Sequence, residues 1–163
     1  MTDCWFTEMH EHDAKFSIQV TEHLYSEKSP YQQIEVYDSK TFGRFLTLDG
    51  FMMLTEKDEF IYHDMISHVA MAVNPDIKRI LIIGGGDGGT AREVLRYDTV
   101  EKVDLVEIDE RVVRICQKYL PQTACKLDSD PRLRIYFEDG LHFVQEMPNQ
   151  SYDLILVDST DPI

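Results

Sequence analysis

The first third of the chain consists of short apolar runs separated by polar residues. Four runs have the length and the β-branched and aromatic content of strands, and they span residues 16–24, 34–39, 43–48 and 51–54. Asp49-Gly50 separates the last two runs, and an Asp-Gly pair is a strong hairpin signal because both turn positions favour positive φ. The pattern predicts a small antiparallel β domain over residues 1–55.

After residue 55 the apolar residues recur at the period of a helix. Those on one side of this segment are Ile61, Met65, Val69 and Val73. Together with the stop signal Asn74-Pro75, they predict an amphipathic helix over residues 58–74 that links the β domain to the rest of the chain. Tyr62 and His63 face a different side of this helix, where such a pair is usually part of the exposed surface.

From residue 79 short aliphatic strands alternate with helical segments. Strands are expected at 80–83, 103–107, 133–137 and 154–157, and helices at 90–97, 110–120 and 141–146. Strands that are apolar on both faces belong to a parallel sheet covered by helices, so residues 56–163 are predicted to form a Rossmann-like domain in an α/β fold. Because such sheets normally continue to about six strands, we expect this domain to be truncated after its fourth strand and completed by a longer natural product or in trans.

Composition narrows the class of protein. Hydrophobic residues make up 43% of the 163 residues and charged residues 28%, as in ordinary globular proteins. No apolar run approaches the ~20 residues that span a bilayer, and the polar, acidic N-terminus is unlike a secretory signal. Three cysteines without a CxxC pair favour a reducing compartment. We therefore expect a cytoplasmic protein with no membrane association.

The charge balance is strongly acidic. The chain has 30 acidic and 16 basic residues and a formal charge of −14. This balance disfavours binding to the phosphate backbone of nucleic acids and suits a cationic small molecule. On charge alone, solubility is the better explanation of the same balance.

A glycine-rich segment, GGGDGG at 84–89, comes after a predicted strand and precedes a predicted helix. Glycines let the backbone turn sharply and approach a ligand, and the start of a helix presents unpaired N–H groups. Glu107 ends the next strand 20 residues beyond Asp87, the spacing at which a carboxylate binds a ribose diol. The segment therefore predicts an adenosine site. A nicotinamide dinucleotide is the alternative ligand, although Asp87 would repel a pyrophosphate and could hold a cationic amine.

Acidic residues also follow the third and fourth predicted strands. Asp139-Gly140 closes the third strand, where a side chain can reach an adenine edge or can simply belong to a solvated turn. Asp158 and Asp161 come after the fourth strand, at the edge of the sheet where ligands bind. With Asp87, which follows the neighbouring strand of the expected sheet, they predict a negative pocket suited to a diamine. A divalent metal such as Mg²⁺ or Ca²⁺ is the alternative occupant.

Several segments together resemble the spermidine synthase family of polyamine aminopropyltransferases. They are TEKDEFIYH at 55–63, IIGGGDGG at 82–89, VEID at 106–109 and DSTDP at 158–162. Ordinary methyltransferases share the glycine segment and Glu107 but not DEFIYH or DSTDP. The resemblance, which covers the chain from Tyr31 onward, implies a small β domain before a Rossmann-like domain of the class I methyltransferase type.

The resemblance also implies an activity. The family transfers an aminopropyl group from decarboxylated S-adenosylmethionine to putrescine, giving spermidine and methylthioadenosine. It requires no metal and no cofactor beyond this co-substrate, and its members are commonly homodimers or homotetramers. The partners implied are therefore the two small-molecule substrates and further copies of the chain, with no nucleic acid.

By resemblance, one set of residues binds the nucleoside donor. Gln32 and Glu107 would hold the nucleoside, with Glu107 on its ribose. Asp139 and Gly140 would contact the adenine side, and Asp87 would bind the aminopropyl amine.

By the same resemblance, a second set serves the acceptor amine. Asp158 would be the general base, helped by Tyr62, and His63 and Asp161 would position the diamine. The family pattern continues beyond residue 163 with a gate-keeping loop and further diamine-binding side chains. One alternative is therefore an inactive fragment that binds a nucleoside or a polyamine. Another is an S-adenosylmethionine-dependent methyltransferase on a small cationic acceptor. A nicotinamide dehydrogenase comes third, and donor selectivity separates these enzymes.

Overall fold

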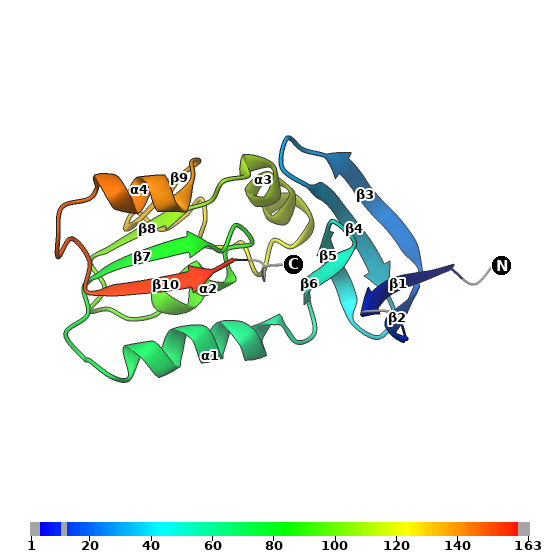
Figure 1. Cartoon of the computed structure of the whole chain (residues 1–163). Coiled ribbons are helices and arrows are strands. Elements are labelled where there is room, and N and C mark those ends of the chain that lie inside the picture. Colours follow the sequence, from blue (N-terminus) through cyan, green and yellow to red (C-terminus); the bar gives the residue numbers. More distant parts are fainter. Residues whose placement is uncertain (1–3, 11–12, 160–163) are drawn as a thin grey trace. The chain divides into compact units, whose positions relative to one another are not determined.

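The computed structural model describes residues 4–10 and 13–159 of the chain. It divides the chain into two compact units, Met1–Glu59 and Phe60–Ile163, each with its own hydrophobic cluster. Figure 1 labels their helices and strands in chain order. No helix in the described part combines the length and the apolar content that crossing a membrane requires.

The first unit consists of antiparallel strands. β1 and β2 form a hairpin, and β3, β4, β5 and β6 form a sheet in that order. The strands are β1 (Cys4–His10), β2 (Ala14–Val20), β3 (Glu22–Lys28), β4 (Gln33–Ser39), β5 (Gly43–Leu48) and β6 (Phe51–Thr55). The buried residues of their cluster are Phe6, Ile18, Val20 and Phe45.

Two features of this unit differ from the sequence prediction. The run predicted as one strand over 16–24 is divided at Thr21, because β2 pairs with β1 whereas β3 pairs with β4. The prediction also missed β1, in which Trp5 and Met9 are exposed and polar residues separate the apolar ones. The hairpin predicted at Asp49-Gly50 is confirmed, with φ of 49° and 84°.

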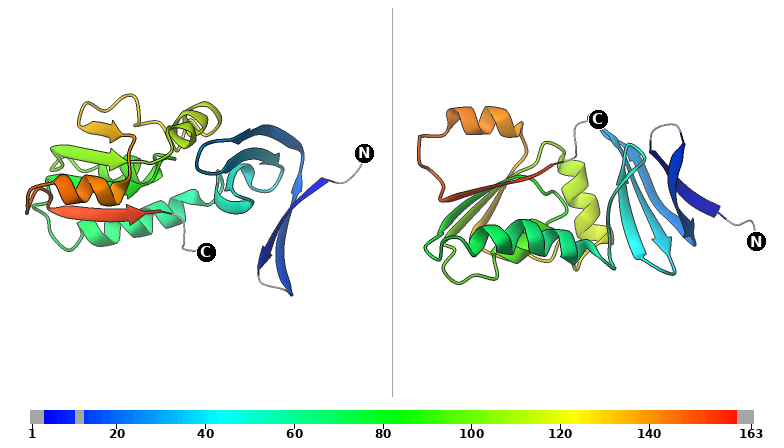
Figure 2. Two further views of the ribbon diagram at one scale, coloured as in Figure 1. Left: turned by 45° about the horizontal axis from the view of Figure 1, so that its top comes forward. Right: turned by 60° about the horizontal axis from the view of Figure 1, so that its bottom comes forward.

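The second unit contains a parallel sheet in the order β10, β7, β8, β9. In chain order the elements are α1 (Glu59–Met71), β7 (Arg79–Gly84), α2 (Gly89–Val94), β8 (Lys102–Val106), α3 (Glu110–Tyr119), β9 (Leu133–Tyr136), α4 (Gly140–Glu146) and β10 (Leu154–Asp158). The inner residues of β7 and β8 are buried, and α1 and α4 lie on opposite faces of the sheet (Figure 2). The predicted α/β arrangement is confirmed.

The helix predicted over 58–74 is present as α1, but its pattern misled on which side is buried. Ile61, Met65 and Val69 are 57%, 62% and 56% exposed, whereas His63 is 2% exposed. Ser67 shares the buried side with His63. The expectation that His63 belongs to the exposed surface is therefore wrong. The rotation of α1 follows from tertiary packing instead of from its apolar stripe.

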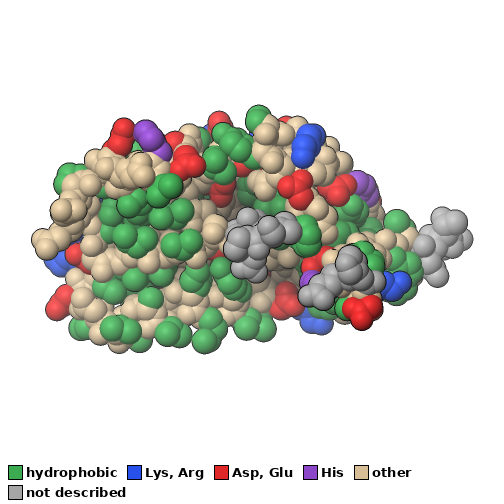
Figure 3. All heavy atoms as spheres, viewed as in Figure 1, with side chains coloured by type: hydrophobic (Ala, Val, Ile, Leu, Met, Phe, Trp, Pro, Cys, Tyr) green, Lys and Arg blue, Asp and Glu red, His purple; other side chains and the backbone are tan. Residues whose placement is uncertain are grey.

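Hydrophobic side chains gather on an exposed face of the second unit (Figure 3). Ile155 and Val157 of β10 are 50% and 59% exposed, and Val144 of α4 is also exposed. β10 is an edge strand of the sheet in the described residues. Apolar surface therefore borders a free strand edge in this part of the fold.

Candidate active site

The glycine turn after β7 packs tightly against the end of β10. Gly84, Gly85 and Gly88 have φ of 81°, 71° and 88°, in the left-handed region that favours glycine. A Cβ on Gly84 would lie 2.0 Å from the backbone oxygen of Asp158, and Gly85 N donates to that oxygen at 2.7 Å. The turn thus needs glycine for its conformation and for contact with the neighbouring strand.

Glu107 comes directly after β8 and lies against the same turn. Its Oε2 accepts from Gly86 N at 3.1 Å and its Oε1 from Asp109 N at 2.9 Å. A Cβ on Gly86 would be 2.8 Å from Oε2, so only glycine leaves room for this carboxylate. Burial raises the pKa of Glu107, and the two backbone N–H groups oppose that rise. The carboxylate lies beside the glycine turn, as a ribose-binding residue would require.

Asp158 ends β10 and is held by hydroxyl groups from two helices. Tyr62 Oη of α1 donates to Oδ1 at 3.0 Å, and Thr90 Oγ1 of α2 donates to Oδ2 at 2.7 Å. Burial and the negative charge of Asp87 raise the pKa of Asp158, while contacts with Thr90, His63 and Tyr62 oppose the rise. A carboxylate with a raised pKa is a better proton acceptor, which suits a general base.

Asp87 and His63 complete the acidic cluster. His63 Nε2 lies 3.2 Å from Asp87 Oδ1, which also accepts from Gly89 N at 2.7 Å. The imidazole lies over Gly89, where an added Cβ would be 2.3 Å from Nδ1. Each of three residues offers one atom of a type that can bind a metal ion, and these atoms lie within 4.8 Å of one another. The residues are His63, Asp87 and Asp158. Such a cluster attracts a protonated amine, and its residue types could also bind a divalent cation.

The structure says less about the roles of the other residues singled out in the sequence. Asp139 is exposed and caps α4 by accepting from His142 N at 2.9 Å. A Cβ on the adjacent Gly140 would lie 2.5 Å from Ile83 Cγ2. Gln32 belongs to the first unit, in the turn before β4. Asp161 lies outside the described residues.

Thr90 is a site residue that the sequence analysis missed. Its hydroxyl is fully buried and reaches a carboxylate 68 positions away in the chain. The expected strand order of a doubly wound sheet already places β10 next to β7, and the pairing of these strands confirms it. The sequence did not show, however, that the first turn of α2 directs the Thr90 hydroxyl toward Asp158.

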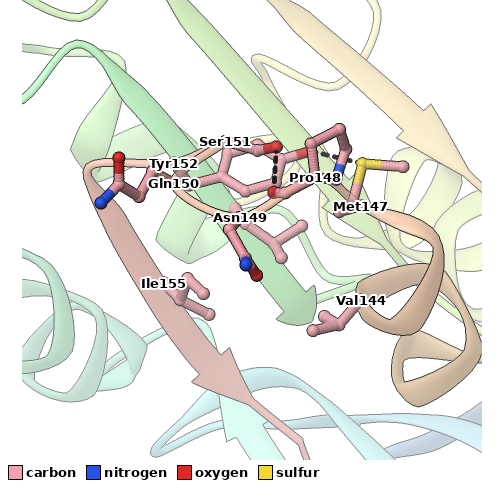
Figure 4. A pocket seen from close by; sticks show the side chains of 9 residues that line it. Val144, Met147, Pro148, Asn149, Gln150, Ser151, Tyr152 and Ile155 are labelled. Atoms are coloured by element: carbon pink, nitrogen blue, oxygen red, sulfur yellow. Dashed lines mark hydrogen bonds between the residues drawn. The ribbon is translucent and has the colours of Figure 1, made fainter.

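A hollow of about 220 Å³ lies at the opposite end of β10 (Figure 4). Val144 and Met147 of α4 line it together with Ile155. Its one titratable side chain, Tyr152, donates to the buried Asp104 at 2.7 Å. The hollow lacks the carboxylates of the acidic cluster and is not the candidate site.

Models of known protein families match both units of the chain. A model of the spermine/spermidine synthase domain matches residues 59–163, and a model of the spermidine synthase tetramerisation domain matches residues 4–56. The chain belongs to the spermine/spermidine synthase family. This result confirms the family resemblance seen in the sequence.

Curated relatives and solved structures agree with this family. The chain is 69% identical to a polyamine aminopropyltransferase of Clostridium acetobutylicum over 163 residues, which are 100% of the chain and 57% of the relative. It is 62% identical to that of Alkaliphilus oremlandii, covering 98% of the chain and 56% of the relative. The chain thus spans little more than half the length of these relatives.

Two solved spermidine synthases have the same fold. One is in complex with the transition-state analogue AdoDATO, with a TM-score of 0.95, 42% identity and coverage of 99% of this chain and 55% of that chain. The other, from Thermotoga maritima, has a TM-score of 0.93, 41% identity and coverage of 98% and 55%. The likeness confirms the predicted fold class. The partial coverage accords with the expectation that the family fold continues beyond the fourth strand of the sheet.

Proposed function

We propose that this chain carries the donor site and the general base of a spermidine synthase. The observation that supports this proposal most strongly is the acidic cluster of Asp87 and Asp158 beside a glycine turn that also contacts Glu107. An adenosine-type site next to two carboxylates suits a nucleoside donor with a cationic amine and a cationic acceptor. The names of the relatives support the same reaction.

The donor would be decarboxylated S-adenosylmethionine. Glu107 would hold its ribose, with Gln32 on the nucleoside, and Asp139 and Gly140 would contact the adenine side. Asp87 would bind the amine of the aminopropyl group. No metal and no further cofactor take part in this proposal.

The acceptor would be putrescine, and Asp158 would take a proton from its attacking nitrogen. An amine is protonated near neutral pH, so it must lose a proton before its lone pair can attack. The lone pair then bonds to the aminopropyl carbon, the carbon–sulfur bond breaks, and its electrons neutralise the sulfonium. Tyr62 would orient Asp158, and His63 and Asp161 would position the diamine. The products are spermidine and methylthioadenosine.

The remaining parts of the proposal concern organisation. We propose two domains, residues 1–55 and 56–163, in a cytoplasmic enzyme. The match of residues 4–56 to a tetramerisation domain supports self-association through the first of these domains. A homotetramer or homodimer is therefore the expected assembly.

The test of this function uses a hybrid protein. In the hybrid, the part of the Clostridium acetobutylicum relative that this chain does not cover is joined after Ile163. The hybrid and the 163-residue chain are each incubated with putrescine and either decarboxylated S-adenosylmethionine or S-adenosylmethionine, and products are identified by mass spectrometry. Spermidine and methylthioadenosine from the decarboxylated donor alone are expected from the hybrid. Methylated putrescine without spermidine would instead identify a methyltransferase.

Replacing Asp87 by asparagine is expected to lower turnover and weaken discrimination between the two donors about 10-fold or more. The carboxylate of S-adenosylmethionine would meet the negative charge of Asp87, and the variant removes that repulsion. The ratio of kcat/KM for the two donors measures the effect. Glu101→Gln is the matched control, since Glu101 is an exposed acid paired with Lys78. An unchanged ratio in the Asp87 variant would remove Asp87 from donor recognition.

A further inference from the structure

A second group of polar side chains joins α1 to α2 outside the acidic cluster. His68 of α1 has Nδ1 2.8 Å from Tyr97 Oη and Nε2 3.2 Å from Glu93 Oε2. Its Nε2 is also 3.4 Å from Asp64 Oδ1, one helical turn earlier. The proposed reaction uses none of these residues, so their contacts with one another require another explanation.

Glu93 is the buried anchor of this group. It is 4% exposed, its Oε1 accepts from Arg92 Nε at 2.7 Å, and its Oε2 accepts from Arg96 Nη1 at 2.6 Å. Burial would raise the pKa of Glu93, but the hydrogen bonds from Arg96 and Arg92 outweigh burial and lower it. Because an ionised carboxylate only accepts, Nε2 of His68 donates to it.

The second contact between α1 and α2 lies at the acidic cluster. His63 packs over Gly89, the first residue of α2, and contacts Asp87. His63 and His68 are separated by about 7.5 Å along the axis of α1, at a rise of about 1.5 Å per residue. Two contact points at this separation fix the direction of α1 against α2. Ser67 and Met71 of α1 are buried as well, so without the His68 contacts α1 would keep its place but could tilt about His63.

The direction of α1 matters because Asp158 receives one hydrogen bond from each helix. Tyr62 of α1 reaches Oδ1 at 3.0 Å and Thr90 of α2 reaches Oδ2 at 2.7 Å. A displacement of about 1 Å would take the Tyr62 contact beyond hydrogen-bond range. Misplacement by that amount can lower an enzymatic rate about 100-fold.

We infer that His68 is a positioning residue for the general base. Its contacts with Glu93 and Tyr97 hold α1 against α2, and Tyr62 thereby keeps its hydrogen bond to Asp158. The inference goes beyond the proposed function and rests on it only for the kinetic part of its test.

A cation site is the alternative role for this group. Asp64, His68 and Glu93 have suitable ligand atoms within 4.8 Å of one another. Two guanidinium groups already contact Glu93, however, and their positive charge disfavours a metal ion there. The positioning role therefore accounts better for the contacts.

The kinetic test is a double-mutant cycle in the hybrid protein with His68→Leu and Tyr62→Phe. His68→Leu alone is expected to lower kcat about 10-fold and to leave KM for the donor within about 2-fold, because Glu107 lies outside α1 and the contact of His63 with the glycine segment is kept. In the Tyr62→Phe background the same substitution should add less than about 2-fold, since both act through one hydrogen bond. His68→Gln keeps an N–H donor for Glu93 and should recover part of the loss.

A second measurement is independent of activity. The Tyr62 hydrogen bond is among the contacts that oppose the raised pKa of Asp158, so His68→Leu should raise that pKa further. Carbon-13 NMR titration of the Asp158 carboxyl group measures it. If the unsubstituted hybrid makes no spermidine, the proposed function fails, and the NMR result alone decides the inference. An unchanged pKa, or fully additive effects on kcat, would overturn the inference.

His23 supplies a matched control. Its Nε2 lies 3.2 Å from Glu35 Oε1, and its ring stacks on Tyr37 at 4.3 Å between centroids. His23→Leu therefore removes a histidine with a carboxylate and a tyrosine partner from β3 of the first unit. It should leave kcat and the pKa of Asp158 unchanged, and a change equal to that of His68→Leu would contradict the inference. If His68→Leu fails to fold, His68→Gln carries the test with a smaller expected change.

Discussion

Replacing Asp158 by asparagine is expected to lower kcat for spermidine formation by about 100-fold to 10,000-fold, the range that a general base contributes. Asparagine has the same size, and the hydroxyl groups of Tyr62 and Thr90 can accept as well as donate. The loss would therefore report the missing basicity of the side chain. Steady-state kinetics of the hybrid protein should show this fall with little change in KM for the donor.

The same substitution should not lower the free energy of unfolding at pH 7. Burial and Asp87 raise the pKa of Asp158 above its ordinary value of 3.8. The folded chain then holds this proton more tightly than the unfolded chain, so ionisation destabilises the fold. The destabilisation is absent below about pH 3.8 and is complete above the folded-state pKa. Asparagine removes it, and urea denaturation at pH 4 and pH 7 measures the difference.

The activity of the unsubstituted enzyme should respond to pH in the corresponding way. Asp158 can accept a proton only when it is ionised, so kcat/KM should fall as the pH drops through its raised pKa. An Asp158→Asn variant with nearly full kcat, or with a large loss of stability at pH 7, would contradict the assignment of Asp158 as the base. Thr90 and Tyr62 would then hold a purely structural carboxylate.

Gly84→Ala is expected to lower the free energy of unfolding by about 2–5 kcal/mol. The φ of 81° at this position disfavours any residue with a Cβ, by about 1–2 kcal/mol. In addition, the new Cβ would lie 2.0 Å from the backbone oxygen of Asp158. Backbone atoms cannot move aside as a flexible side chain can, so strands β7 and β10 must separate, at a further cost of about 1–3 kcal/mol. Activity should fall with the displacement of Asp158.

Gly50→Ala is the matched control for Gly84→Ala. Gly50 has a φ of 84°, but no atom lies within 4 Å of the position of an added Cβ. Its substitution should therefore destabilise only through backbone conformation, by about 1–2 kcal/mol. Urea denaturation measures the losses, and amide hydrogen exchange assigns them to β7 and β10 or to β5 and β6. Equal losses in the two variants would show that the contact between Gly84 and Asp158 is not tight.

The second unit was more predictable from sequence than the first. Its strands β7 and β8 are apolar on both faces, a pattern that indicates a buried parallel sheet whatever surrounds it. The glycine segment identified the turn after β7 for a similarly local reason, since left-handed backbone favours glycine. In the first unit, the chain passes at Thr21 from the β1–β2 hairpin to the sheet that begins with β3. The mixed polar and apolar residues of β3 gave no signal of this break.

The side that α1 buries was not predictable. Its apolar stripe at Ile61, Met65 and Val69 indicates one buried side, yet His63 and Ser67 lie on the side that packs inward. The orientation depends on Gly89, which leaves space for the imidazole ring. A periodic pattern describes a helix by itself and contains no information about the surface that receives it.

By itself, the sequence determined the kinds of residue available for the chemistry. It determined the order, along the chain, of the strands and helices that carry these residues. It also determined the family, because DEFIYH and DSTDP occur together with the glycine segment. Only the tertiary structure decided that Asp158 lies between Tyr62 and Thr90, that His63 is buried against Asp87, and that His68 joins α1 to α2. These contacts join residues far apart in the chain. They depend on the directions in which the side chains of α1 and α2 point toward β10, and on the packing of α1, neither of which a local pattern specifies.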